Sequence, residues 1–207
     1  MTLAVRNAKP GDVAAMVSLC AAAFPTSARW ASPRAGTRWW AGCLRGDCAE
    51  TWVALDTEAI VGVLALVHDE TGWARGRGQR RVTLADLLWS APAQARAIIR
   101  RLSAGVGARS QNESSSPDRG AQPAETARAG RRLWLELIAV HPSAQGRGVG
   151  GALLSHAMER ARSLGRDAVT LQVRAANTRA GAVYEKHGFA PVRRSRHDLT
   201  YSRRVSA

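Results

Sequence analysis

The chain has 207 residues, of which 45% are hydrophobic and 22% are charged, and its formal net charge is +14. This composition excludes collagen-like and fully disordered chains, and the length suits one well-buried domain. The longest apolar run, residues 60–67, is far shorter than the roughly 18 residues that a membrane-spanning helix needs. The N-terminus has no apolar signal core. We therefore expect a cytoplasmic protein that does not enter a membrane.

The positive charge comes almost wholly from arginine, since Lys9 and Lys186 are the only lysines in the sequence. A basic surface can attract nucleic acid, an acidic substrate or a phosphorylated cofactor. The basic residues are scattered, however, and no aromatic residues are interleaved with a basic stripe, so nucleic-acid binding is disfavoured. The three cysteines lack metal-ligand spacing, and we expect neither a metal site nor a disulfide framework.

The N-terminal half predicts a strand, two helices and a hairpin. A short strand around Val5 is followed by residues 13–23, whose apolar positions repeat with the helical period. Within residues 30–44, a group of apolar side chains near the end could form one face of a second helix. Residues 51–55 and 59–67 are β-rich runs separated by a short polar turn, which indicates an antiparallel hairpin.

The amino-acid composition changes in the middle of the chain. Residues 84–102 predict a helix, but residues 103–130 are rich in Ser, Gly, Ala, Gln and Pro and carry almost no large apolar side chain. Such a segment cannot bury enough surface to offset the entropy lost on ordering. We predict that residues 103–130 form a flexible insertion within a single domain that spans residues 1–207.

From residue 133 onward, strands and helices alternate. The patterns predict strands at 133–140 and 168–173, helices at 148–164 and 177–187, and final strands near 191–194 and 197–202. Gly165 and Gly188 stand where the two helices should end, and Asn177 stands where the second should begin. His187 is predicted to be only the last helical position. The alternation indicates an α/β fold.

A glycine-rich run, Gln145-Gly146-Arg147-Gly148-Val149-Gly150-Gly151, joins a predicted strand to a predicted helix. Glycines let the backbone approach a ligand closely, and the amides at a helix start carry partial positive charge. The run could therefore cradle a phosphate, with Arg147 adding a charge-assisted contact. Its spacing and late position differ from a dinucleotide-binding fingerprint, and it lacks the Gly-Lys-Ser/Thr of a P-loop. A glycine-rich helix start without a ligand is the alternative.

Two motifs together resemble one protein family. Residues 133–154 resemble the central motif of the GNAT superfamily of N-acetyltransferases, because Gln145, Gly148 and Gly150 match its Gln/Arg-x-x-Gly-x-Gly/Ala pattern. Residues 171–189 resemble the family's Asn…Tyr-Glu-x-x-Gly-Phe segment. The resemblance implies an α/β fold with a mixed, splayed central sheet flanked by helices. It also implies transfer of an acetyl group from acetyl-CoA to a primary amine, without a metal.

The resemblance also implies roles for individual residues. The contacts to acetyl-CoA would come from Ile138, Ala139, Val140, Gln145, Gly146, Arg147, Gly148, Val149, Gly150, Gly151 and Asn177. Tyr184 would protonate the leaving thiolate, since a phenol pKa near ~10 is close to a thiol pKa near ~8.5. Glu136 would be the base for the amine, and strand alternation predicts that it shares a face with Trp134 and Ile138. The motifs offer no Cys or Ser with an obvious base, which favours direct attack in a ternary complex.

One position departs from a branch of the family. The branch that acetylates ribosomal-protein N-termini resembles Leu-Glu-Val-Arg-Ala-Ser-Asn at the second motif, whereas this chain has Gln172 in place of the carboxylate. An amide cannot act as a base, so that branch's acceptor and mechanism do not transfer directly. The acceptor could be a small-molecule or peptide amine, and a homodimer would be common for the family. A non-catalytic CoA-binding or protein-interaction module on the same fold is the alternative function.

Overall fold

The computed structural model describes residues 3–27, 30, 32–45, 48–70, 73 and 131–205. The predicted helix at 84–102 and the predicted insertion at 103–130 lie outside the described residues. The strands are β1 (Leu3–Asn7), β2 (Ala49–Asp56), β3 (Ala59–Val67), β4 (Arg132–Val140), β5 (Ala168–Arg174), β6 (Ala190–Arg194) and β7 (Asp198–Arg204). The longer helices are α1 (Val13–Ala23), α2 (Pro33–Arg45), α7 (Val149–Ser163) and α8 (Thr178–Lys186), and short 3-10 turns lie at η1 (Pro10–Asp12) and η2 (Pro142–Ala144).

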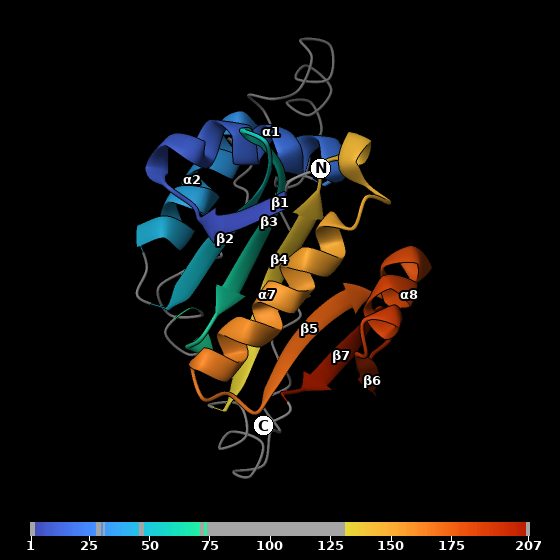
Figure 1. The fold of residues 1–207 in the computed structure, drawn as a ribbon. Coiled ribbons are helices and arrows are strands. Elements are labelled where there is room, and N and C mark those ends of the chain that lie inside the picture. The colour runs from blue at the N-terminus through green and yellow to red at the C-terminus, as the bar shows by residue number, and fades with distance from the viewer. Residues whose placement is uncertain are drawn as a thin grey trace, which may run out of the picture.

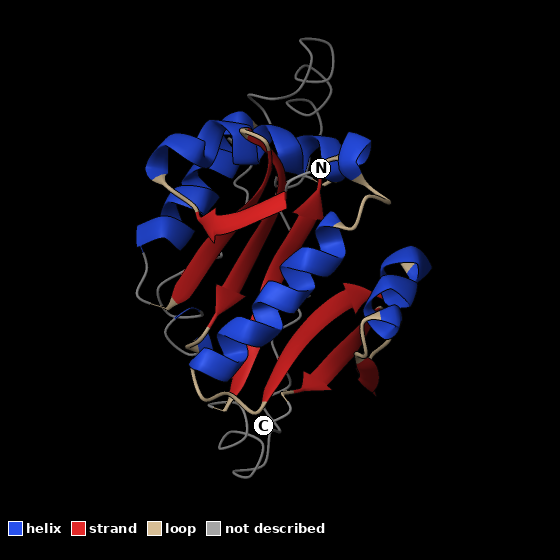
Figure 2. Ribbon diagram, viewed as in Figure 1, coloured by secondary structure: helices blue, strands red, loops and turns tan. Residues whose placement is uncertain are grey.

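Within these residues, the strands form one seven-stranded sheet in the order β1-β2-β3-β4-β5-β7-β6 (Figures 1 and 2). The predicted hairpin is present, since β2 and β3 pair antiparallel across a short turn. The predicted helices and strands that fall in the described ranges are also present, with ends that differ slightly from the predicted bounds. None of the described helices combines the length and the apolar composition needed to cross a bilayer.

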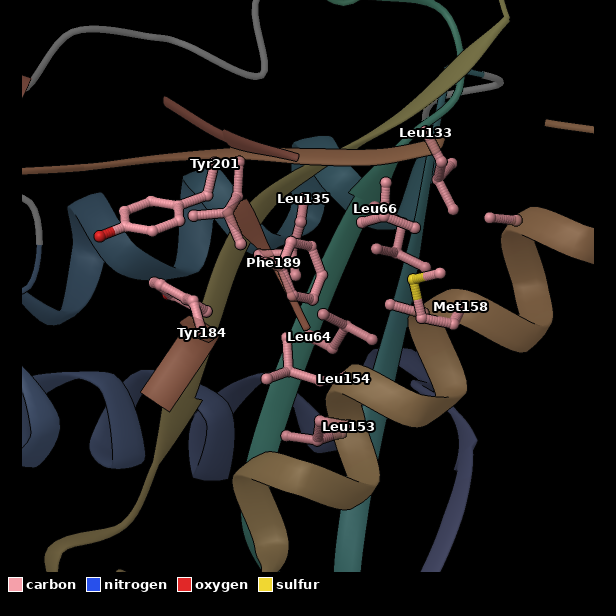
Figure 3. Close-up of a cluster of buried hydrophobic side chains, with 14 of the residues drawn as sticks. Leu64, Leu66, Leu133, Leu135, Leu153, Leu154, Met158, Tyr184, Phe189 and Tyr201 are labelled. Carbon is pink, nitrogen blue, oxygen red and sulfur yellow. The ribbon is translucent and has the colours of Figure 1, made fainter. Parts of the chain in front are cut away.

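Both faces of the sheet are apolar because both are covered by helices. Successive residues of a strand point to opposite faces, so Leu64 and Leu66 of β3 join a cluster with α7, whereas Val63 and Ala65 join a cluster with α1 and α2. We call these the α7 face and the α1–α2 face. Figure 3 shows the α7-face cluster, in which side chains of β3 and β4 meet those of α7.

The strands β4 and β5 separate partway along their length. They run parallel and are paired from Arg132–Ala168 to Leu135–Leu171, and their pairing ends there. Beyond this point β4 continues along β3 and β5 continues along β7. The two strands visibly diverge toward their C-terminal ends (Figure 1). Since the other neighbouring strands are antiparallel, the predicted mixed, splayed sheet is confirmed.

A β-bulge in β4 begins where the strands separate. Ala65 of β3 pairs with Leu137 and Leu66 pairs with Leu135, so Glu136 is an extra residue in β4. An extra residue reverses which side chains point to which face. Trp134 therefore packs on the α1–α2 face, whereas Ile138 packs on the α7 face. The prediction that Trp134 and Ile138 share one face with Glu136 is wrong, because simple alternation does not hold across a bulge.

The first turns of α7 lie close to β3 because β3 has no side chain at Gly62. A Cβ atom at this position would lie 2.8 Å from Cγ1 of Val149 and 2.9 Å from Cδ1 of Leu153. Both partners are fully buried, so neither can move aside without disturbing its neighbours. Gly62 thus sets how closely α7 approaches the sheet.

Gly62→Val is expected to lower the free energy of unfolding by about 2 kcal/mol, because the added atoms overpack this contact. Gly42→Ala is the control, since Gly42 lies inside α2 and a Cβ there meets nothing within 4 Å. Alanine should raise stability at that position by up to about 1 kcal/mol, because it is the better helix former. Denaturant unfolding measures both changes. A stable Gly62→Val variant would contradict the close approach of α7.

Candidate functional site

A cavity of about 540 Å³ lies beside the separated part of β4. Its walls are the end of β4, the loop and first turn of α7, one face of α8 and the end of α1. Most of the predicted site residues line it, namely Ile138, Ala139, Val140, Gln145, Gly146, Gly148, Gly150, Gly151, Asn177 and Tyr184. Glu136, Arg147 and Val149 are not among the lining residues.

The loop before α7 opens the start of the helix toward the cavity. Gly148 is the N-cap and has a φ of 84°, in the left-handed region that strongly favours glycine. Among the described residues, no backbone carbonyl accepts a hydrogen bond from the amides of Val149, Gly150 and Gly151. Helix-start amides that lack such partners carry partial positive charge. The first turn of α7 can therefore bind an anion.

The side chains of the loop mainly hold the loop in place. The Gln145 amide donates to the carbonyl of Val140 at 3.3 Å, which ties the loop to the end of β4. The Arg147 guanidinium pairs with Asp56 at 2.9 Å, at the end of β2. Val149 is buried against β3. The anion site therefore consists of backbone amides, because the Arg147 side chain is paired with Asp56.

Tyr184 is a buried phenol that faces both the core and the cavity. The residue is 8% exposed, and its ring packs 6.1 Å from Phe189 and 5.9 Å from Tyr201, measured between centroids (Figure 3). Burial raises the pKa of Tyr184 to about 12, above the value near ~10 that the sequence suggested. Tyr184 is thus a weaker acid than expected and keeps its proton over the whole physiological range.

Glu136 lies on the other face of the sheet. The indole Nε1 of Trp134 donates to its carboxylate at 3.1 Å, and Trp134 packs on the α1–α2 face. Tyr184 belongs to the cluster on the α7 face. The two predicted catalytic side chains therefore lie on opposite faces of the sheet. Glu136 and Tyr184 flank the point at which β4 and β5 separate.

One face of α8 forms a wall of the cavity. Asn177 caps this helix, since its side-chain oxygen accepts from the amide of Ala180 at 3.2 Å. Ala180, Val183, Tyr184 and His187 follow it on the cavity wall. These positions repeat at helical spacing, so the sequence pattern contained a signal for Val183 and His187 that the motif comparison missed.

The cavity also has cationic side chains that the motifs did not indicate. Arg179 and Lys186 of α8 both line it. No described carboxylate forms an ion pair with either side chain. Among the described residues, no three His, Cys, Asp or Glu side chains gather as metal ligands. The site therefore combines apolar walls, open amides and positive charge.

Comparison with known proteins links part of the chain to one family. Residues 101–189 match the family described as "Acetyltransferase (GNAT) family". Over these residues the chain is similar to members of this family. The matched residues include the loop before α7 and all of α8, so the GNAT match covers most of the cavity wall.

Relatives of known structure share this GNAT fold. The PaiA N-acetyltransferase from Thermoplasma acidophilum, solved in complex with coenzyme A, has a TM-score of 0.60 at 10% identity, and the match covers 99% of both chains. The ribosomal-protein-S18-alanine N-acetyltransferase from Escherichia coli has a TM-score of 0.58 at 16% identity, covering 100% of this chain and 96% of that one. At these identities the likeness establishes the fold.

A curated relative is similar over a short segment. The mycothiol acetyltransferase of Beutenbergia cavernae is 48% identical over 56 residues, which is 27% of this chain. The segment spans 19% of that relative's own length. The similarity to this acetyltransferase thus lies in one short segment of the chain.

The raised pKa of Tyr184 can be measured directly, because the chain has two tyrosines. In Tyr201→Phe, Tyr184 is the remaining phenol, and phenolate absorbance is expected to rise with a pKa of about 12. Denatured protein should titrate near ~10. Because the folded pKa is the higher one, Tyr184 stabilises the fold below pH ~10, and this stabilisation is lost as the pH rises through about 12. A folded-state transition near ~10 would contradict the burial of Tyr184.

Proposed function

We propose that this protein is an N-acetyltransferase that binds acetyl-CoA in the cavity and transfers the acetyl group to a primary amine by direct attack in a ternary complex. The proposal depends on one observation: β4 separates from β5 beside a cavity that the open first turn of α7 also lines. A thioester substrate with a long arm and a diphosphate needs both features. The match of residues 101–189 to the GNAT family supports the same activity.

The residues present suit this substrate. A volume of about 540 Å³ lies within the usual range for small-molecule sites. The diphosphate would bind to the amides of the loop and first turn, including those of Gly146, Val149 and Gly151. The apolar side chains of Ile138 and Val183 would contact the pantetheine arm. Asn177, Arg179 and Lys186 would add polar and cationic contacts along α8.

The side chain of Arg147 has a less direct part in the proposal. Its guanidinium would reach the diphosphate only by leaving Asp56, with which it pairs at 2.9 Å. Exposed ion pairs of this kind contribute little to stability, typically below about 1 kcal/mol. Breaking the pair with Asp56 to bind a phosphate would therefore cost little free energy. The backbone of the loop is therefore the main proposed anchor.

The backbone of β4 supplies the electrophilic assistance. Past Leu135 the edge of β4 that faces away from β3 is no longer paired with β5. Amides at Ile138, Ala139 and Val140 that point to this side could donate to the thioester carbonyl. Such donors polarise the carbonyl and stabilise the negative charge that develops on oxygen.

Tyr184 and Glu136 would handle the two protons. As the amine nitrogen bonds to the carbonyl carbon and the carbon–sulfur bond breaks, Tyr184 would donate its proton toward the leaving thiolate. Glu136 would take the proton from the amine, directly or through water. Their positions on opposite faces of β4 suit an amine arriving from the α1–α2 face and a thiol leaving on the α7 face. With a pKa of about 12, Tyr184 serves better as a hydrogen-bond donor than as a strong acid.

The acceptor is a small-molecule or peptide amine. Gln172 in place of a carboxylate counts against the ribosomal-protein N-terminal acceptor. We further propose a homodimer, as is common in the family, which sedimentation analysis would test.

The activity itself is tested by calorimetry with acetyl-CoA, followed by thiol-release assays over a panel of amines. Binding without release for any amine would favour a CoA-binding module instead, and no binding would overturn the proposal.

Tyr184→Phe is expected to lower kcat by about 10²-fold or more, because a positioned acid typically contributes that much. The dissociation constant for acetyl-CoA should change less than about twofold, since phenylalanine keeps the ring. Tyr201→Phe is the matched control, because Tyr201 donates to Glu185 at 2.9 Å and is not a cavity residue. Equal losses of turnover and affinity in Tyr184→Phe would rule out the proton-donor role.

Glu136→Gln is expected to lower kcat/KM by about 10²-fold near neutral pH, because the amide cannot accept the proton of the amine. The amide oxygen can still accept from the indole of Trp134, so stability should change little. Glu159→Gln, on the exposed side of α7, is the control. Full activity of Glu136→Gln in a steady-state assay would exclude Glu136 as the base.

A further inference from the structure

His187 lines the cavity at the end of α8, yet the proposed reaction gives it no part. Its Nδ1 atom lies 2.8 Å from the carbonyl oxygen of Val183. A carbonyl oxygen can only accept a hydrogen bond, so Nδ1 carries a proton whether the ring is neutral or charged. The ring orientation is thereby fixed, and the second nitrogen, Nε2, is left for other partners.

Nε2 is directed at the first turn of α7. A Cβ atom built on Gly151 would lie only 2.6 Å from this nitrogen. The imidazole therefore occupies space that the absence of a side chain at Gly151 leaves open. The same turn carries the amides that donate to no backbone carbonyl within the described residues. His187 thus connects the end of α8 to the anion-binding start of α7.

We propose that protonated His187 donates a hydrogen bond from Nε2 to a phosphate of CoA, so that CoA binding takes up a proton. This inference rests on the proposed binding of CoA in the cavity. The bare Nε2 of a neutral ring can only accept a hydrogen bond and would repel a phosphate oxygen. The charged ring donates instead, and a charge-assisted bond to phosphate is a strong one. Histidine is the side chain that gains a proton near neutral pH.

The charged groups around the ring are mainly cations. Lys186 and Arg179 of α8 line the same cavity, and Arg203 of β7 donates to the backbone carbonyl of His187 at 2.7 Å. The α8 acid, Glu185, accepts from the hydroxyl of Tyr201 instead. The first turn of α7, Val149 to Gly151, has no titratable side chain. A bound diphosphate would therefore supply the negative charge that favours the protonated ring.

The test uses dephospho-CoA as the probe, because this compound keeps the diphosphate and lacks the monoester phosphate that titrates near ~6. Calorimetric titrations near neutral pH, in buffers with different ionisation enthalpies, give the number of protons taken up per molecule bound. Wild-type protein should take up a measurable fraction of a proton. Its affinity should rise about tenfold from weakly alkaline to weakly acidic pH, as expected for one charge-assisted hydrogen bond.

Two variants separate the roles of the ring nitrogens. His187→Asn can keep a donor near the Nδ1 position but has no group at Nε2, so both proton uptake and the pH-dependent gain in affinity should be lost. His187→Gln places a neutral donor near Nε2, so affinity should be partly retained while proton uptake is lost. His197→Gln, in the exposed turn between β6 and β7, is the control and should behave as wild type.

The outcomes distinguish this inference from the proposed function. Equal proton uptake by wild type and both His187 variants would overturn the role of His187 while leaving CoA binding intact. Loss of uptake in the His187 variants, with uptake retained in His197→Gln, would support it. Circular dichroism establishes that each variant is folded. Failure of the wild-type protein to bind either acetyl-CoA or dephospho-CoA would overturn the proposed function, and this inference with it.

Discussion

The separation of β4 from β5 creates the space around which the candidate site is built. Their ladder stops at Leu135 and Leu171, after which each strand keeps only its outer neighbour, β3 or β7. Backbone groups on the inner edges of the gap therefore need other partners, because an unsatisfied polar group is costly when it is removed from water. The cavity, the open start of α7 and the wall of α8 all gather on this side of β4. A ligand with amide and phosphate groups could form hydrogen bonds with the backbone groups that the separated strands and the start of α7 leave without partners.

The bulge at Glu136 gives this gap two chemically different sides. By adding one residue to β4, it turns Leu137 and Ala139 toward α1 and α2, and Ile138 and Val140 toward α7. Tyr184, fixed by its packing in the α7-face cluster, therefore stands across the sheet from Glu136. A regular strand would have given a different arrangement, since every side chain after position 136 would face the other way. This single insertion therefore decides that Ile138 and Val140 point toward α7.

Much of the site was readable from the sequence because its signals are local. The glycines before α7, the cap at Asn177 and the spacing to Tyr184 all lie within short segments, and the structure places them around one cavity. The orientation of Ile138 was mispredicted because a bulge is a property of two paired strands, and β3 lies some 70 residues earlier in the chain. Lys186 and His187 were missed as cavity residues because the motif comparison considered family-matching positions alone.

Local sequence patterns predicted the helices and strands of the described segments, the glycine-rich loop before α7 and the resemblance to the GNAT family. These depend on backbone preferences and side-chain periodicity over a few residues. Three features could not be read from local patterns: Arg147 pairs with Asp56, burial raises the pKa of Tyr184 to about 12, and His187 meets Gly151. Each of these depends on groups brought together from separate segments, so the distances and the solvent exclusion that cause them exist only once the chain has folded.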